Sequence, residues 1–129
     1  MNAKPKILVV DDEPGIRGLL QYELGFSGYE TVTVESADQA LEILQGHPVD
    51  LVITDIRMPG SMDGIDFIET YRKENPHQKV IFMTGYAIEE KISLALQNPL
   101  SFCIKKPFDI QELSEMIAQC LNESVSNGK

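Results

Sequence analysis

Carboxylates stand directly after two apolar runs of this chain. Asp11 and Asp12 follow the run 7–10, and Asp55 follows the run 51–54. Both runs are rich in β-branched residues, as is typical of strands that are covered on both faces. Carboxylates at strand ends can ligate a hard divalent cation or act as nucleophiles. These acids are therefore the first candidates for chemistry.

A hydroxyl and an ammonium group follow two further strand-like runs. Thr84 comes after the run 80–83, and Lys106 comes after the run 101–105. Hydroxyl, ammonium and Mg²⁺ together can neutralise the spread negative charge of a phosphoryl group in transfer. Asp55 is the expected nucleophile, because it stands alone on its strand while Asp11 and Asp12 can hold the metal.

Five strand-like runs alternate with segments of helical periodicity. We expect strands at about 6–10, 31–34, 51–54, 80–83 and 101–105. Apolar residues spaced three or four apart predict helices whose core residues run from Ile16 to Leu24, Ala37 to Leu44, Ile65 to Tyr71, Ile88 to Leu96 and Ile110 to Leu121. This alternation predicts a doubly wound α/β domain, a (βα)5 flavodoxin-like three-layer sandwich with a parallel sheet.

Local signals predict where the helices begin and end. Gly25 and Gly28 should close the first helix, and Ser36 opens a capping box for the second. Pro99 should terminate the fourth helix, and Asp109 is a good N-cap for the last. We expect residues 123–129 to form a polar C-terminal tail.

The carboxyl ends of parallel strands meet at one edge of their sheet. In the expected strand order 2-1-3-4-5, the first and third strands are neighbours about 5 Å apart, so Asp11, Asp12 and Asp55 must converge. Three carboxylates so close together repel one another when all of them are ionised. Either one pKa rises or a hard cation neutralises the cluster, and Mg²⁺ is the natural occupant.

Each of these residues also has an ordinary explanation when it is taken alone. Asp11 and Asp12, with Glu13, could be N-cap and first-turn acids that oppose a helix dipole. Asp55 could be a turn residue, and Thr84 and Lys106 could be solvated strand ends. Acids on adjacent strands crowd one another without the compensation that a cap provides, so the joint placement favours a functional site.

Composition excludes several classes of protein. The 129 residues, 43% of them hydrophobic, fit one domain, which we place at residues 5–122. No apolar run approaches the roughly 20 residues of a membrane span, and the short start lacks a signal peptide, so we expect a soluble cytoplasmic protein without a membrane partner. Cys103 and Cys120 are expected to be buried thiols and not to form a disulfide. A net charge of −9 argues against direct nucleic acid binding.

Taken together, the motifs resemble those of the response regulator receiver domain of two-component and phosphorelay signal transduction. They are Asp11-Asp12, Asp55 with Met58-Pro59 and Asp63-Gly64, Thr84, and Lys106-Pro107-Phe108. The resemblance implies that Asp55 accepts a phosphoryl group, in a Mg²⁺-dependent reaction, from a histidine kinase or a histidine phosphotransfer protein. It also implies that Asp12, Asp55 and the Arg57 carbonyl bind Mg²⁺, that Asp11 acts largely through water, and that Thr84 and Lys106 bind the phosphoryl oxygens. The Lys106-Pro107 bond is often cis in this family.

A receiver domain is a signalling phosphoprotein that assists its own phosphorylation and dephosphorylation, and it is not an enzyme with a separate substrate. Its aspartyl phosphate would bias a surface around the fourth helix, fifth strand and last helix toward an output protein or effector domain. The cognate kinase, the output partner and the pathway stay open. The chain could act alone or be a receiver excised from a longer protein.

Other functions fit the sequence less well. A haloacid-dehalogenase-like phosphatase would need Asp11-Asp12-Glu13 as its Asp-x-Asp motif, and it would need a later acidic pair that is missing here. A flavodoxin would need backbone amides and hydroxyls, rather than acids, in its first loop to cradle phosphate. An unphosphorylated receiver-like interaction domain is disfavoured because none of the five site residues is lost.

One departure from the family pattern concerns the position three before Lys106. Cys103 stands where the family commonly has a switch aromatic, and Phe102 lies one place early. Strand alternation should place Phe102 and Ile104 on the face of the sheet opposite to Cys103.

Overall fold

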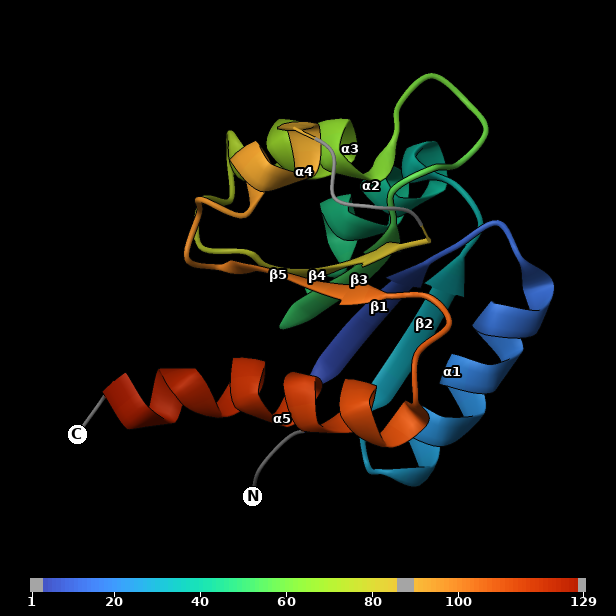
Figure 1. The fold of residues 1–129 in the computed structure, drawn as a ribbon, viewed down its shortest axis with the longest axis vertical. Coiled ribbons are helices and arrows are strands. Elements are labelled where there is room, and N and C mark those ends of the chain that lie inside the picture. The colour runs from blue at the N-terminus through green and yellow to red at the C-terminus, as the bar shows by residue number, and fades with distance from the viewer. Residues whose placement is uncertain (1–3, 86–89, 128–129) are drawn as a thin grey trace.

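Five parallel strands form one sheet between two layers of helices (Figure 1). The computed structural model describes residues 4–85 and 90–127, with side chains up to residue 122. The strands are β1 (Lys6–Val10), β2 (Glu30–Val34), β3 (Leu51–Asp55), β4 (Lys79–Thr84) and β5 (Ser101–Lys105). Their order is β2-β1-β3-β4-β5, which confirms the expected flavodoxin-like topology.

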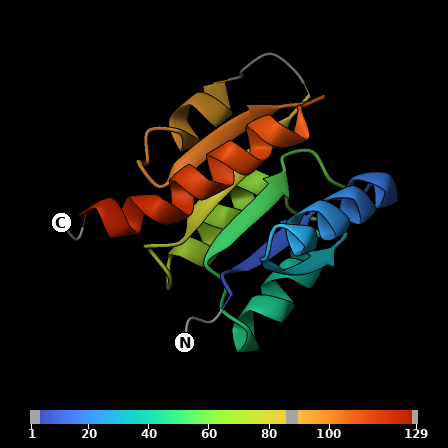
Figure 2. The same ribbon diagram turned by 90° about the horizontal axis from the view of Figure 1, so that it is seen from below.

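The helices divide between the two faces of the sheet. They are α1 (Pro14–Phe26), α2 (Ala37–Gly46), α3 (Gly64–Arg72), α4 (Glu90–Ala95) and α5 (Ile110–Asn127). Helices α1 and α5 cover one face, and Figure 2 shows them in front of the sheet. Helices α2, α3 and α4 cover the other face. The three-layer sandwich predicted from the alternating pattern is therefore confirmed.

Each face of the sheet has its own hydrophobic cluster, because successive residues of a strand point to opposite sides. Along β1, Leu8 and Val10 pack with α2, α3 and α4, whereas Ile7 and Val9 pack with α1 and α5. All four side chains are fully buried. Burial on both faces explains why the first run of the sequence is apolar without alternation.

The strand register decides which residues meet at the carboxyl edge. Val10 of β1 pairs with Thr54 of β3, so the next residues, Asp11 and Asp55, lie side by side. Thr84 of β4 pairs with Lys105 of β5, which puts Lys106 one residue beyond the last pair. A one-residue slip would turn every one of these side chains to the opposite face of the sheet.

Most of the predicted helix boundaries agree with the structure. The Ser36 side chain accepts a hydrogen bond from the Gln39 amide, and Asp109 accepts one from the amide of Gln111. Gly25 lies inside α1 and does not close it, so that expectation was wrong. Gly28 is the residue that turns the chain, with a φ of 97° that favours glycine.

The last two helices differ from expectation in length. Helix α4 ends at Ala95, earlier than predicted, and Ile88 lies outside the described residues. Helix α5 continues to Asn127, so the backbone of residues 123–127 is helical where we expected a tail. No proline or glycine follows Pro107 until Gly128, so nothing in the sequence breaks the helix before that point.

Candidate functional site

The three predicted acids converge at the carboxyl edge of the sheet. One ligand atom from each of Asp11, Asp12 and Asp55 lies within 4.8 Å of the other two. Asp11 is fully buried, Asp55 is partly buried and Asp12 is exposed. The acids come from the ends of the neighbouring strands β1 and β3, as the predicted strand order requires.

Lys106 lies among these carboxylates. Its Nζ is 2.9 Å from Asp11 Oδ2, 3.2 Å from Asp55 Oδ2 and 3.1 Å from Glu13 Oε1. The Lys106 side chain is 15% exposed, and the Glu13 side chain is 61% exposed. An ammonium group has three protons, so each can be donated to a different carboxylate.

The charges in this cluster shift two pKa values. Burial raises the pKa of the Asp55 carboxyl, and the nearby Asp11 carboxylate adds to this rise, although the Lys106 ammonium opposes it. Burial alone would lower the pKa of Lys106, but hydrogen bonds to Asp11 and Glu13 outweigh that effect and raise it. The surroundings of Lys106 therefore favour its charged form, whereas the surroundings of Asp55 disfavour its ionised form.

The remaining predicted residues line a hollow of about 400 Å³ beside the cluster. Its walls are formed by Asp12, Glu13, Asp55, Ile56, Arg57, Thr84, Gly85 and Lys106. Thr84 ends β4 and is partly buried, and Arg57 is exposed on the loop that follows β3. The structure thus brings together Asp12, Asp55, Arg57, Thr84 and Lys106, with Asp11 joined to them through Lys106.

The start of α3 supports the backbone of Asp55. The Gly64 amide donates to the Ile56 carbonyl, and a Cβ at Gly64 would lie 2.1 Å from the Asp55 carbonyl oxygen. Only glycine permits so close an approach. Asp63 caps α3 by accepting from the Asp66 amide, and it forms an ion pair with Lys91 of α4 at 2.7 Å.

The donor set fits a hard divalent cation. Three carboxylates supply oxygen ligands, which Mg²⁺ prefers to nitrogen or sulfur. The same three groups leave an excess of negative charge that Lys106 alone does not balance. A cation at this position would remove the repulsion between Asp11 and Asp55 that contributes to the raised pKa of Asp55.

Two features of the site were missed from the sequence. The Glu13 side chain was interpreted as a possible helix-cap acid, but it makes no capping hydrogen bond to the described residues of α1 and contacts Lys106. Lys91 was not considered, although it joins α4 to the start of α3. Neither contact has a sequence signal, because each pairs residues that lie far apart in the sequence, 28 positions for Lys91 and Asp63 and 93 for Glu13 and Lys106.

The cysteines agree with expectation in part, and the fifth strand agrees with it. Cys103 and Cys120 are free thiols, but only Cys120 is buried, whereas Cys103 is partly buried. Cys103 packs against the cluster beneath α2, α3 and α4, whereas Phe102 and Ile104 pack with α1 and α5. The Lys106-Pro107 peptide bond is cis.

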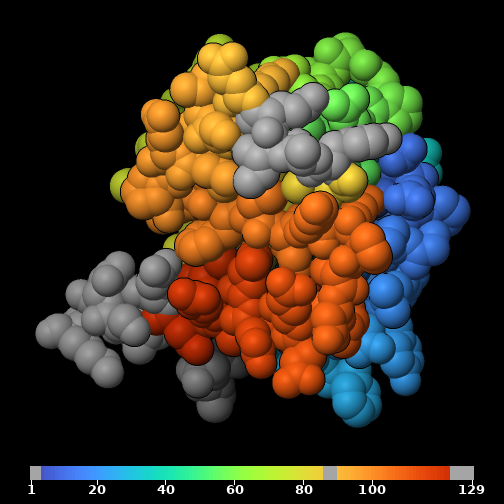
Figure 3. All heavy atoms as spheres, viewed as in Figure 1, coloured from blue at the N-terminus to red at the C-terminus, as the bar shows by residue number. Residues whose placement is uncertain are grey.

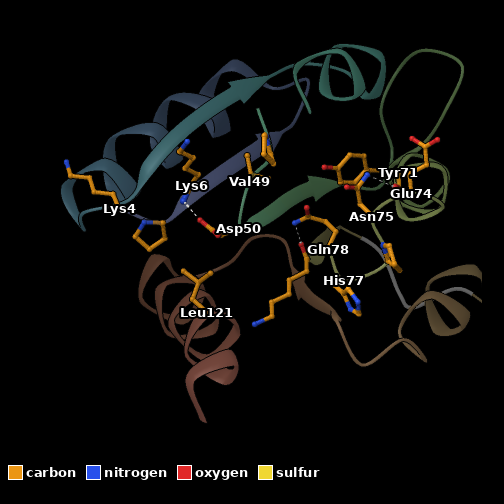
Figure 4. A pocket seen from close by; sticks show the side chains of 14 residues that line it. Lys4, Lys6, Val49, Asp50, Tyr71, Glu74, Asn75, His77, Gln78 and Leu121 are labelled. Atoms are coloured by element: carbon orange, nitrogen blue, oxygen red, sulfur yellow. Dashed lines mark hydrogen bonds between the residues drawn. The ribbon is translucent and has the colours of Figure 1, made fainter. Parts of the chain in front are cut away.

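A larger hollow, of about 930 Å³, lies at the opposite edge of the sheet (Figure 4). Residues near the start of three strands line it, including Lys6, Asp50 and Gln78. Some of their polar groups have partners in the protein: the Lys6 backbone amide donates to Asp50, and the Gln78 side chain donates to the Lys79 carbonyl. The predicted site residues are not among those that line it.

The helices of the described segments are too short or too polar to cross a membrane.

Comparison with known proteins gives one consistent result. The family model for the response regulator receiver domain matches residues 7–118. The chain is 35% identical over 116 residues to sporulation initiation phosphotransferase F of Bacillus subtilis (strain 168), covering 90% of this chain and 93% of that protein. It is 37% identical over 126 residues to the transcriptional regulatory protein GlrR of Escherichia coli (strain K12), covering 96% of this chain but only 28% of GlrR.

Solved structures show the same fold. A CheY-like response regulator receiver domain protein from Methanospirillum hungatei JF-1 aligns with a TM-score of 0.89 at 30% identity, over 97% of this chain and 99% of that one. The chain also matches NtrX from Brucella abortus with a TM-score of 0.85 at 31% identity, over 98% of this chain and 30% of NtrX. The chain thus spans less than a third of the length of some of its relatives.

Proposed function

Because this chain belongs to the response regulator receiver domain family of two-component signalling, we propose that Asp55 is its phosphoacceptor. The observation that carries the proposal is the convergence of Asp11, Asp12 and Asp55 with the Lys106 ammonium at one edge of the sheet. Asp55 is the acid at the end of the central strand β3 and lines the hollow that a phosphoryl group would enter.

The transfer itself needs little covalent chemistry from the protein. The phosphorus–nitrogen bond of a donor phosphohistidine breaks as a phosphorus–oxygen bond to the Asp55 carboxylate forms, and the imidazole leaves. Lys106 already lies 3.2 Å from Asp55 and can donate to a phosphoryl oxygen there. The Thr84 hydroxyl lines the same hollow and is the second expected donor.

Mg²⁺ is the expected cofactor, held by Asp11, Asp12, Asp55 and the Arg57 carbonyl. When bound, it supplies positive charge against the spread negative charge of the phosphoryl group. Asp11 and Asp12 lie at the end of a strand that is buried on both faces, so they hold their positions without help from a flexible loop. Burial raises the pKa of Asp55, so its ionised form is disfavoured when the cation is absent, and a bound cation would favour the carboxylate.

The phosphorylated chain would signal through the surface that α4, β5 and α5 share, which Figure 3 shows on one side of the molecule. Cys103 of β5 is small and only partly buried beneath α4, so it cannot fill space as a swinging aromatic would. We therefore expect the displacement of α4 to carry the signal. The donor would be a histidine kinase or a histidine phosphotransfer protein, and the receiver of the signal an output protein or effector domain.

Intact-mass analysis with a small phosphodonor tests this proposal. We expect one phosphoryl adduct on the wild-type chain in Mg²⁺, and none in EDTA or in Asp55→Asn. Asp50→Asn is the matched control, because Asp50 directly precedes β3 while Asp55 ends it. An adduct that persists in Asp55→Asn, or that forms equally well in EDTA, would exclude Asp55 as the magnesium-dependent phosphoacceptor.

A further inference from the structure

We propose that Glu13 is a positioning residue, which keeps Lys106 at the mouth of the hollow when a cation occupies the carboxylates of Asp11 and Asp55. The inference rests on the proposed function of Asp55. It is carried by the ion pair between Glu13 and Lys106, in which the two residues lie 93 positions apart in the sequence.

The position of Glu13 in the chain argues against a role in the helix. Glu13 is the N-cap residue of α1, where the side chains of Ser, Thr, Asp or Asn usually accept a hydrogen bond from the first turn. The Glu13 side chain makes no such bond to the described residues of α1, and it reaches across to Lys106. Its carboxylate is therefore directed toward the site and away from the helix.

The three carboxylates around Lys106 are not equivalent. Asp11 and Asp55, 0% and 13% exposed, belong to the group of acids that could share a metal ion. Glu13 is 61% exposed and does not belong to that group. A divalent cation would therefore compete with Lys106 for Asp11 and Asp55, and it would leave the contact with Glu13 intact.

This difference gives Glu13 its role. A divalent charge on Asp11 and Asp55 repels the Lys106 ammonium, whose flexible stem could then turn into water. Glu13 gives the ammonium a partner at the outer side of the hollow, still within reach of a phosphoryl group on Asp55. An ion pair with one exposed partner supports an effect of about two- to fivefold on the binding of that group.

Beryllofluoride, a phosphoryl mimic, provides the test at saturating Mg²⁺ by amide NMR titration. We expect Glu13→Gln to weaken its binding by about two- to fivefold. Glu13→Asp keeps the charge but shortens the side chain, so it should show the same loss while remaining able to cap α1. Glu74→Gln is the matched control, because Glu74 is also exposed but lines only the cavities away from the acids.

A double-mutant cycle and a direct observation of the lysine complete the test. In a Lys106→Met background, Glu13→Gln should cause no further loss, because its partner is gone. The ammonium signal of Lys106 should persist in Mg²⁺ in the wild type and disappear by exchange with water in Glu13→Gln, an effect that a loss of helix stability would not produce.

Two outcomes would overturn the inference. One is wild-type affinity in Glu13→Gln with an unchanged Lys106 signal. The other is full affinity in Glu13→Asp, which would assign the effect to charge at the mouth and not to the contact with Lys106. If the wild type binds no more beryllofluoride than Asp55→Asn does, the proposed function itself fails, and the inference fails with it.

Discussion

The two edges of the sheet differ in cavity size and in charge. The larger cavity lies at the amino edge, whereas the cluster of acidic side chains lies at the carboxyl edge. The carboxyl edge has a hollow of about 400 Å³, lined by Asp12, Glu13, Asp55 and Lys106 with Asp11 beside them. The amino edge has a hollow of about 930 Å³, in which basic and acidic side chains are nearly balanced. Chemistry is expected at the smaller hollow.

This difference follows from the direction of the strands. Parallel strands place all their carboxyl ends at one edge, where the connections to the helices converge and carry functional side chains. At this edge three carboxylates contact the Lys106 ammonium, and a fourth, that of Asp12, lies close to two of them, so Lys106 alone does not balance their charge. Cavity size identifies room for a ligand, whereas unbalanced charge on fixed strand ends identifies the ligand's chemistry.

The largest effect is expected when the packing of the carboxyl edge is disturbed. In Gly64→Ala, the new Cβ would lie 2.1 Å from the Asp55 carbonyl, and the backbone would have to move. We expect a loss of about 1–3 kcal/mol in the free energy of unfolding, measured with denaturant. Gly46→Ala at the amino edge is the control, because nothing lies within 4 Å of its Cβ and its stability should be unchanged or slightly higher. Equal losses of unfolding free energy in Gly64→Ala and Gly46→Ala would show that the two edges do not differ in how tightly they are packed.

The sequence predicted the parts of the molecule that follow from strand periodicity. The five strands lie within about one residue of their predicted ends, and β-strand order places Asp11 beside Asp55 as expected. The contact between Glu13 and Lys106 could not be predicted, because it depends on the direction of one side chain at the start of α1. The need for glycine at position 64 likewise appears only when α3 is placed against β3.

The next effect concerns the cation. At a Mg²⁺ concentration ten times its dissociation constant, Mg²⁺ should stabilise the wild type by about 1.4 kcal/mol. The reason is that Mg²⁺ binds the acids where folding brings them together and not in the unfolded chain, where they are far apart. Thermal unfolding with and without EDTA measures this gain. Asp12→Asn should lose most of it, whereas Glu74→Gln at the amino edge should keep it, because Glu74 lines only the hollows away from the acids. A gain that survives in Asp12→Asn would place the bound cation elsewhere.

Removing one acid from each edge should change stability in opposite directions. Burial and the Asp11 carboxylate hold the pKa of Asp55 above its ordinary value of 3.8, despite Lys106, so ionised Asp55 opposes folding. This penalty is present above the folded-state pKa and disappears as the pH falls below 3.8. At pH 7 without Mg²⁺, Asp55→Asn should therefore be more stable than the wild type, by roughly 1 kcal/mol.

Asp50 provides the comparison at the amino edge. Its carboxylate accepts a hydrogen bond of 2.8 Å from the Lys6 amide, so Asp50→Asn should lose about 0.5–1 kcal/mol at neutral pH. Denaturant unfolding at pH 7 and near pH 3 measures both variants. If Asp55→Asn is less stable than the wild type at pH 7, the ion pair with Lys106 stabilises the fold by more than the burial of ionised Asp55 destabilises it. The charge of Asp55 would then not oppose folding.

The smallest effect belongs to the ion pairs that join α4 to α3. Lys91 Nζ lies 2.7 Å from Asp63 and 3.0 Å from Asp66, but the Lys91 side chain is 49% exposed, so water screens both pairs. Lys91→Met should therefore cost only about 0.2–1 kcal/mol at pH 7. Lys73→Met, at the amino-edge end of α3, is the matched control and should stay within about 0.5 kcal/mol of the wild type.

The pH dependence of this cost gives the sharper test. Burial raises the pKa of Asp63, but hydrogen bonds from the Asp66 amide and Lys91 outweigh it, and the net pKa is lowered. Stabilisation from Asp63 is thus present above 3.8 and is lost as the pH falls through the folded-state pKa, the reverse of Asp55. The cost of Lys91→Met should shrink in acid, as measured by unfolding at pH 7 and near pH 2. A cost that stays constant with pH would mean that the lysine acts through packing of its stem and not through its charge.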